Sequence, residues 1–236
     1  MPRRKQEFPS FETIVGRIHA EDDPDNPSVH VTERMITAAQ NIFEKTTYDN
    51  LTGLLRRDVF GERVESWVRK NPDDFFTLAY IDLDKFKNIN TQYGHAGGND
   101  VLRAVGAGIG RAFQRTGEAA SRLGGDEFSI MIPRDHEKGD DDEEDLNFRG
   151  QHSEDDLRDY IEGTIVASVL DQVSEADAQR MKKILKLSIG LVVLSAGQAR
   201  GKELDELLET ANMGMFVDKL RPKPDIEDDP PVVPSP

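Results

Sequence analysis

The sequence predicts an α+β fold in which a mixed β-sheet is flanked by helices packed on one side. Two observations predict it. Apolar patterning runs in the order strand, helix, hairpin, helix, strand and helix, which is typical of this fold class. The dipeptide Gly124-Gly125 separates two β-rich runs, and strands joined in this way form a hairpin. With 36% hydrophobic residues among 236, the chain can build one core of ordinary size, so some segments are expected to lie outside it.

The first half of the predicted domain alternates helices and one strand. Apolar side chains at helical spacing predict a helix from about 33 to 46 and a second helix over 57–70. The aromatic and β-branched run 75–81 predicts a buried strand that ends at Asp82. A third helix is expected over 100–113, because apolar residues again recur on one of its sides.

The second half supplies the hairpin and the remaining cover of the sheet. Strands are expected at 120–123 and 127–132, on either side of the two glycines. A helix over 157–173, a buried strand over 185–194 and an amphipathic helix over 204–220 follow.

Three glycines inside the third helix resemble a nucleotide-binding glycine loop only superficially. Gly106, Gly108 and Gly110 lack the spacing of such loops and do not follow a strand. We expect them to let the helix lie close to the sheet, despite a cost of about 1 kcal/mol per glycine relative to alanine.

The formal net charge of −15 is concentrated in one segment. The 25 residues of 135–159 contain 12 acidic and 3 basic side chains, and 140–145 is an unbroken run of carboxylates. Such a run buries nothing, so we expect an insertion at 135–156 that forms a solvated loop. Calcium binding is the alternative, although the run lacks the glycine and the alternating ligands of an EF-hand.

Composition also limits the organisation and the partners of the chain. We expect a polar arm and helix over 1–47, a folded domain over 48–223 and a Pro-rich extended tail over 224–236. No apolar run has the length of a signal peptide core or of a bilayer span, which favours a cytoplasmic protein without a membrane partner. The acidic balance argues against duplex nucleic acid as a partner, and the absence of cysteine excludes thiolate chemistry.

Two predicted strand ends carry carboxylates. Asp82 ends the first strand, and Asp126 and Glu127 follow the two glycines in the hairpin turn. If the strand lies beside the hairpin, the three like charges cluster and require a cation, for which Mg²⁺ with nucleotide phosphates is the natural choice. Gly124 and Gly125 permit positive φ and leave room for a phosphorylated ligand. The alternative is an ordinary hairpin whose acids face solvent.

These residues resemble the GGDEF-domain diguanylate cyclase family. The resemblance covers roughly residues 49–223 and depends on several motifs in order. The signature is Gly124-Gly125-Asp126-Glu127-Phe128, and the other matching segments are 49–54 with Arg57, 82–90, 94–99 and 187–190.

The resemblance implies a palm-like domain of the ferredoxin-like, nucleotidyl cyclase type. It implies a homodimer that condenses two GTP into cyclic di-GMP and two pyrophosphates by metal-assisted attack of a 3′-hydroxyl on an α-phosphate. Asp82, the carbonyl of Leu83 and Asp126 would hold Mg²⁺, or Mn²⁺, with Glu127 as a further ligand or as the base. The resemblance further implies catalytic roles for Asp126, Glu127, Lys87 and Arg122 and substrate contacts from Phe86, Asn90, His95, Asn99, Gly124, Gly125, Lys219 and Lys223.

Several positions depart from the family pattern, among them Asn99, Thr91 and Glu118. The family usually has Asp at the position of Asn99, where a carboxylate accepts two hydrogen bonds from guanine, whereas an amide matches adenine better. A cyclase that accepts ATP is therefore one alternative, and a one-residue bulge after Gly98 that places Asp100 there is another. Arg115 and Glu118 match the family's inhibitory product site except that Glu replaces Asp, and the other interpretation is a solvated helix end. A degenerate module that binds GTP or cyclic di-GMP without turnover is the remaining functional alternative.

Overall fold

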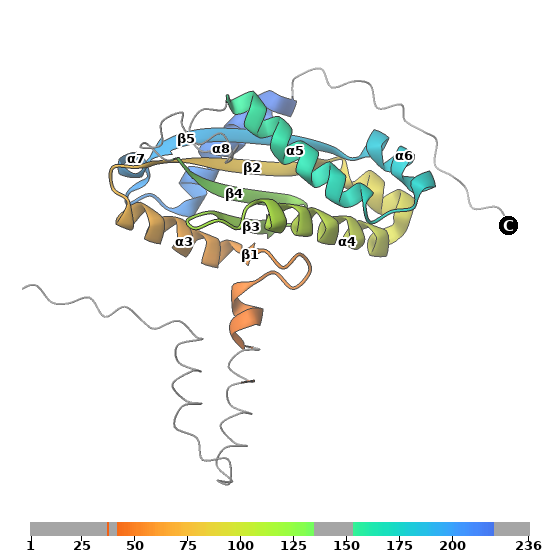
Figure 1. Ribbon diagram of the computed structural model, residues 1–236, viewed down its shortest axis with the longest axis horizontal. Coiled ribbons are helices and arrows are strands. Elements are labelled where there is room, and N and C mark those ends of the chain that lie inside the picture. The colour runs from red at the N-terminus through yellow and green to blue at the C-terminus, as the bar shows by residue number, and fades with distance from the viewer. Residues whose placement is uncertain (1–36, 38–41, 135–152, 220–236) are drawn as a thin grey trace, which may run out of the picture. The chain divides into compact units, whose positions relative to one another are not determined.

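The computed structural model describes residues 37, 42–134 and 153–219 (Figure 1). The chain divides into two compact units. The first unit is residues 1–47 and the second is residues 48–236. Thr37 and residues 42–47 of the first unit are helical, in agreement with the predicted helix at 33–46 where that helix is described.

The second unit contains a five-stranded mixed sheet, as predicted. Its strand order is β1-β3-β4-β2-β5. Every neighbouring pair is antiparallel except β1 and β3, which are parallel. The strands are β1 (Leu55–Arg56), β2 (Phe75–Asp84), β3 (Ala119–Gly124), β4 (Glu127–Arg134) and β5 (Lys186–Ser195).

Six helices of the described part accompany the sheet, and none of the described helices has the length and apolar character needed to cross a bilayer. Two short helices were not predicted: α6, which follows α5 in the chain, and α7, which follows β5. The helices are α3 (Arg57–Lys70), α4 (Phe86–Ala112), α5 (Glu154–Leu170), α6 (Glu175–Ile184), α7 (Ala196–Ala199) and α8 (Leu204–Lys219).

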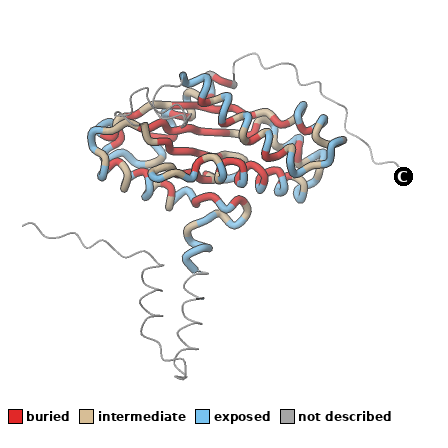
Figure 2. Tube along the Cα trace, viewed as in Figure 1, coloured by how far each residue is buried: buried red, intermediate tan, exposed pale blue. Residues whose placement is uncertain are grey.

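Helices cover both faces of the sheet, so the expectation that they pack on one side is wrong. Figure 1 shows α5 crossing the sheet in front and α8 crossing behind it. The interior strand β2 explains this, because its residues are buried on both faces (Figure 2). Leu78 and Tyr80 belong to the core under α3 and α8, and Ala79 and Ile81 belong to the core under α4 and α5. A strand that is apolar on both faces needs cover on both.

α4 begins at Phe86 rather than near residue 100, and it consists of two helical segments that meet at Gly94. Gly94 has φ 71° and ψ 172°, a conformation that L-residues rarely adopt. The prediction missed the first segment because Asn and Gly residues interrupt its apolar pattern. The kink at Gly94 sets the direction of the segment that carries Lys87 and Asn90.

The glycines inside α4 let this helix approach Thr52 and helix α5. The expectation that they bring the helix close to the sheet is therefore wrong. A Cβ on Gly106 would lie 2.6 Å from Cβ of Thr52, and one on Gly108 would lie 2.7 Å from Cβ of Ser168 in α5. The Ser168 hydroxyl donates a 2.7 Å hydrogen bond to the carbonyl of Ala104. The close approach therefore serves contact between two helices.

The last residues of the predicted acidic loop belong to α5. Ser153 is the N-cap, and its hydroxyl accepts a hydrogen bond from the Asp156 N–H in a capping box. Glu154, Asp155 and Asp156 occupy the first turn, where the helix dipole favours negative charge. The remainder of the predicted insertion, 135–152, lies outside the described residues.

β5 is an edge strand that α8 approaches very closely. A Cβ on Gly190 would lie 2.0 Å from the carbonyl oxygen of Ala211, so only glycine fits there. The N–H of Ile189 donates to the buried carboxylate of Asp218 at 3.2 Å, and the Ile189 carbonyl accepts from Nε of Arg158 at 3.2 Å. Arg158 and Asp218 also face each other at 3.6 Å. α5 and α8 are thus tied to the same point of β5.

Candidate functional site

The hairpin between β3 and β4 has the geometry that its two glycines predict. Gly124 has φ 151° and Gly125 has φ 54°, both in the region that disfavours side chains. A Cβ on either glycine would meet no atom within 4 Å. The glycines are therefore required by the backbone of the turn, and the space beside them is open to a ligand.

The Arg122 guanidinium binds the backbone of this turn. Its Nε and Nη2 donate to the carbonyl of Gly125 at 3.0 and 2.7 Å. Its Nη1 donates to Oδ1 of Asp49 at 3.2 Å, and the Arg122 side chain is only 15% exposed. These contacts fix the turn to the segment that precedes β1. A contact of Arg122 with a phosphate group stays a prediction.

Asp49 is a part of the site whose contacts were not predicted. Burial alone would raise its pKa, but hydrogen bonds from the hydroxyl and N–H of Thr52 and the bond and charge of Arg122 outweigh burial and lower the pKa. The Thr52 bonds measure 2.8 and 2.9 Å. Asp49 is therefore a stable anionic partner for Arg122.

The sheet brings the two predicted acidic segments together. Asp82 and Glu127 are direct cross-strand partners in the β2–β4 pair. The N–H of Leu83 donates to the carbonyl of Asp126 at 3.3 Å. All four residues of the predicted metal site thus meet at one end of the sheet.

The donor set at this end consists of oxygen atoms only. Carboxylates and a backbone carbonyl are the ligands that Mg²⁺ prefers, so the chemistry of these residues fits the ion. The described residues contain no group of three or more His, Cys, Asp or Glu side chains arranged to hold a metal. The backbone brings Asp82, Asp126 and Glu127 to one edge of the sheet. Their three side chains do not converge on one point, because like charges repel.

Tyr80 is a neighbour of this edge that the sequence did not single out. It lies two residues before Asp82 in β2, and it is 7% exposed. Burial raises the pKa of the phenol, and so do the neighbouring Glu127 carboxylate and, more weakly, the charge of Asp82. The charge of Arg57 opposes them. A tyrosine in an apolar strand is normally core, so the sequence offered no signal for this contact.

The first segment of α4 presents the residues expected to contact a nucleotide base. A Cβ on Gly98 would lie 2.0 Å from Oδ1 of Asn90 and 3.3 Å from Cζ of Phe86. Gly98 therefore gives Asn90 and Phe86 room to lie against the second segment. Lys87 and His95 are exposed on α4.

Asn99 and Asp100 lie side by side in the second segment of α4, and both are exposed. Gly94 is the only residue within α4 with non-helical dihedral angles. The alternative alignment, which requires a bulge after Gly98, is therefore not supported. Asp100 instead pairs with Arg103 at 2.5 Å, one turn further along the helix.

Arg115 and Glu118 form a closed turn between α4 and β3. The N–H of Arg115 donates to Oε2 of Glu118 at 2.9 Å, and the N–H of Glu118 donates to the Arg115 carbonyl at 3.0 Å. Gly117 supplies the positive φ of 89° that this turn needs. The Glu118 carboxylate thus has a structural partner, and a product site here stays a prediction.

The two lysines expected near the phosphates lie at or beyond the end of α8. Lys219 is the last residue of α8, and its side chain lies outside the described part. Lys223 lies outside the described residues altogether.

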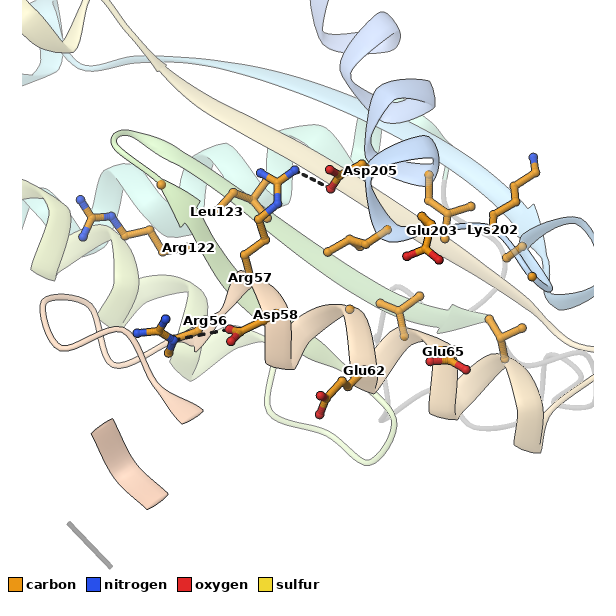
Figure 3. Close-up of a pocket in the computed structure, with 18 of the residues that line it drawn as sticks. Arg56, Arg57, Asp58, Glu62, Glu65, Arg122, Leu123, Lys202, Glu203 and Asp205 are labelled. Atoms are coloured by element: carbon orange, nitrogen blue, oxygen red, sulfur yellow. Dashed lines mark hydrogen bonds and ion pairs between the residues drawn. The ribbon is translucent and has the colours of Figure 1, made fainter. Parts of the chain in front are cut away.

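A cavity of about 1120 Å³ lies beside the hairpin, between α3 and the loop that precedes α8 (Figure 3). Among the predicted site residues, Arg122, Gly124 and Gly125 line it. Figure 3 shows the ion pair of Arg57 with Asp205, which measures 2.6 Å, at its wall. Both acidic and basic side chains line this cavity. It adjoins the turn but differs from the edge at Asp82, where the expected metal ligands are all oxygen atoms.

Comparison with known proteins identifies similar sequences over the first part of the domain. Residues 46–154 match the family model described as "Diguanylate cyclase, GGDEF domain". The uncharacterized protein YhcK of Bacillus subtilis is 38% identical over 89 residues, which are 36% of this chain and 24% of YhcK. Diguanylate cyclase DgcP of Pseudomonas aeruginosa is 32% identical over 122 residues, 51% of this chain and 18% of DgcP. The chain spans less than a third of the length of these curated relatives.

Solved structures show the same fold. The coiled coil and GGDEF domain of DgcB from Caulobacter crescentus, in complex with c-di-GMP, align with a TM-score of 0.55 at 17% identity over 88% of this chain and 94% of that chain. A sensory box/GGDEF family protein from the same organism aligns with a TM-score of 0.52 at 22% identity over 73% and 97%. At these identities the similarity concerns the arrangement of strands and helices.

Proposed function

Because the chain belongs to the GGDEF-domain diguanylate cyclase family, we propose that it is an active diguanylate cyclase. It would condense two GTP into cyclic di-GMP and two pyrophosphates. The observation that carries this proposal is the pairing of Asp82 with Glu127 across the sheet, next to the open Gly124-Gly125 turn.

The proposed reaction is a phosphoryl transfer between two GTP molecules. The 3′-oxygen of one GTP forms a bond to the α-phosphorus of the other, the bond to the β-phosphate oxygen breaks, and pyrophosphate leaves. The hydroxyl proton passes to a base, for which Glu127 is the candidate. A second identical step closes the ring.

This chain's own residues would position the reactants. Asp82, the Leu83 carbonyl, Asp126 and Glu127 would hold Mg²⁺ or Mn²⁺. When bound, such an ion orients the triphosphate and offsets developing negative charge. The open turn at Gly124 and Gly125 leaves space for the phosphates beside the backbone. Lys87 and the end of α8 would neutralise phosphate oxygens, and Asn90 and Asn99 would contact the base.

The first test is product formation by the full chain. Incubation with GTP and MgCl₂ should yield cyclic di-GMP, detected by chromatography and mass spectrometry. Glu127→Gln and Asp82→Asn should each lower kcat about a hundredfold or more with melting temperatures near that of the wild type. Glu209→Gln, on the exposed face of α8, is the matched control and should retain activity.

The result also separates catalysis from simple binding. Tight GTP or cyclic di-GMP binding by calorimetry, without product at high protein concentration, would replace the cyclase by a nucleotide-binding module.

Asn99 supports a second candidate, a cyclase that accepts ATP for one or both substrates. The residue is exposed on the helix that carries Asn90, and its amide suits adenine better than guanine. In a mixture of equal ATP and GTP, Asn99→Asp should lower the ratio of adenine-containing to guanine-only product about tenfold. Asp100→Asn changes a neighbouring residue by the same chemistry and should leave the ratio unchanged. An unchanged ratio in Asn99→Asp would remove Asn99 from base selection.

A further inference from the structure

We infer that Ser188 and Asp84 act as a positioning pair in the proposed reaction. The Ser188 hydroxyl holds the Asp84 carboxylate and so fixes the junction between β2 and α4, next to Asp82. The inference rests on the proposed function, because this junction connects the expected metal ligands of β2 to the expected substrate contacts of α4. The role of both residues is indirect, and neither is a proposed ligand of the metal or of GTP.

The bond between the two side chains is short and shielded from water. Oγ of Ser188 donates to Oδ1 of Asp84 at 2.6 Å. Ser188 is fully buried, and Asp84 is half-buried at the end of β2. Hydrogen bonds that a carboxylate accepts are about twice as strong as those between neutral groups. The pair therefore ties the last residue of β2 firmly to β5.

The register of the sheet places this bond next to the expected metal ligands. Ser188 lies directly opposite Asp82 in the β2–β5 pair. Asp82 and Asp84 are two residues apart, so their side chains and that of Ser188 share one face of the sheet. Between them in the chain, the Leu83 N–H donates to the Asp126 carbonyl at 3.3 Å. The end of β2 is thus held by a backbone bond toward the hairpin and by a side-chain bond toward β5.

The residue that follows Asp84 has a backbone conformation that needs support. Lys85 has φ 53° and ψ 33°, and it is the only described residue other than glycine with a positive φ. L-residues enter this left-handed region at a cost in free energy, and they remain there where neighbouring contacts hold them. The Lys85 carbonyl accepts from the Asn88 N–H at 2.7 Å on the side of α4. The bond of Ser188 to Asp84 supplies the support on the side of the strand.

The turn at Lys85 sets the position of the first segment of α4 relative to the end of β2. This segment carries Lys87 and Asn90, the expected contacts of phosphate and base, whereas Asp82 and the Leu83 carbonyl are expected to hold the metal. A shift of one set against the other would misplace the α-phosphate relative to the attacking hydroxyl. A displacement of about 1 Å can lower a rate about a hundredfold. The pair would therefore affect the rate through geometry.

The test compares the turnover of GTP with MgCl₂ by variants of the full chain. Ser188→Ala should lower kcat about tenfold or more and change KM for GTP less than about twofold, because no group that contacts GTP is removed. Asp84→Ala should have a similar effect. The double variant should be no slower than the slower single variant, because both changes remove the same bond.

Two further variants distinguish the bond from charge and from general stability. Asp84→Asn keeps an oxygen that can accept the Ser188 hydroxyl, so it should retain most of the activity. Ser168→Ala is the matched control, because it also removes a buried serine hydroxyl, one that donates at 2.7 Å to the Ala104 carbonyl. It should keep the kcat of the wild type.

Amide hydrogen exchange supplies a readout that does not depend on turnover. The Asn88 N–H, which is bonded to the Lys85 carbonyl, should exchange about fivefold faster in Ser188→Ala. In Ser168→Ala it should exchange at the wild-type rate. Equal exchange in Ser188→Ala and the wild type would show that the pair does not hold the junction.

The outcomes separate the inference from the function on which it rests. Wild-type protein that forms no cyclic di-GMP would overturn the proposed function. An active wild type whose kcat is unchanged in Ser188→Ala, or whose losses multiply in the double variant, would overturn the positioning pair alone. An Asp84→Asn variant as slow as Asp84→Ala would also reject it, because the charge would then matter instead of the bond. If Ser188→Ala does not fold at the assay temperature, the contrast between Asp84→Ala and Asp84→Asn at the half-buried strand end decides the question.

Discussion

Arg122 and Asp49 join two parts of the chain through one partly buried ion pair. Arg122 bonds the Gly125 carbonyl with two nitrogens and Asp49 with a third. A lysine could not make these contacts at once, because its ammonium is a single point of charge. The shape of the turn therefore depends on a carboxylate that lies 73 positions before Arg122.

Asp49→Asn is expected to loosen the turn and to destabilise the domain. Hydrogen bonds to charged groups contribute about 1.5–3 kcal/mol, so a loss of that size is expected at neutral pH. The pKa of Asp49 is lowered in the folded protein, so its contribution is present above the ordinary pKa and is lost as pH falls through the folded value.

Thermal unfolding from pH 7 down to acid checks this prediction. The difference in melting temperature between wild type and Asp49→Asn should shrink below about pH 4. Arg103→Lys alters an exposed ion pair and serves as the control, with little expected effect. A difference that grew on acidification would contradict the role given to Asp49.

Single residues of the site differ in how far the sequence predicts them. The positive φ of Gly124 and Gly125 follows from the turn that two β-rich runs require, and the structure confirms it. The partner of Arg122 could not be predicted, because a long side chain can reach several groups and only the tertiary fold selects one. Tyr80 was missed for a related reason, since its apolar ring fits a buried strand whether or not its hydroxyl has a function.

At the scale of elements, the close contact of α8 with β5 constrains both elements. A Cβ on Gly190 would overlap the Ala211 carbonyl oxygen and lie 2.3 Å from the Met215 nitrogen. Both atoms are backbone, so α8 as a whole would have to move.

Gly190→Ala should therefore lower the free energy of unfolding by about 3 kcal/mol or more, as overpacking of a rigid site does. Gly163→Ala is the matched change inside α5, where nothing lies within 4 Å of an added Cβ. It should raise stability by about 0.5–1 kcal/mol, because alanine is the better helix former. Urea unfolding of both variants measures the contrast, and similar effects of the two changes would refute it.

Element prediction succeeded where apolar periodicity was clear. α3 was predicted at its observed bounds, 57–70. The first segment of α4 was missed because local polarity and glycine hide a helix that packing stabilises. β1 has two residues, too few for any pattern, and α6 is a short charged helix. The side on which each helix packs depends on connections that periodicity does not encode.

At the scale of the whole molecule, the proposed reaction needs two copies. The described part of the chain offers one hairpin site, and the proposed product contains two nucleotides, so we propose that the sites of two copies face each other. We therefore expect α,β-methylene GTP with Mg²⁺ to raise the molar mass measured by light scattering from 26.5 kDa toward twice that value. A mass that stays monomeric under conditions of product formation would contradict the paired arrangement.

The open edge of the sheet limits how such pairs can form. At Ile189, in the middle of β5, the outward N–H and carbonyl are already bonded to Asp218 and Arg158. A strand from another molecule would have to displace this partly buried ion pair before it could add to the sheet. Edge-to-edge polymerisation through β5 is therefore disfavoured at this point. We expect copies at high local concentration to associate through their helical and loop surfaces instead.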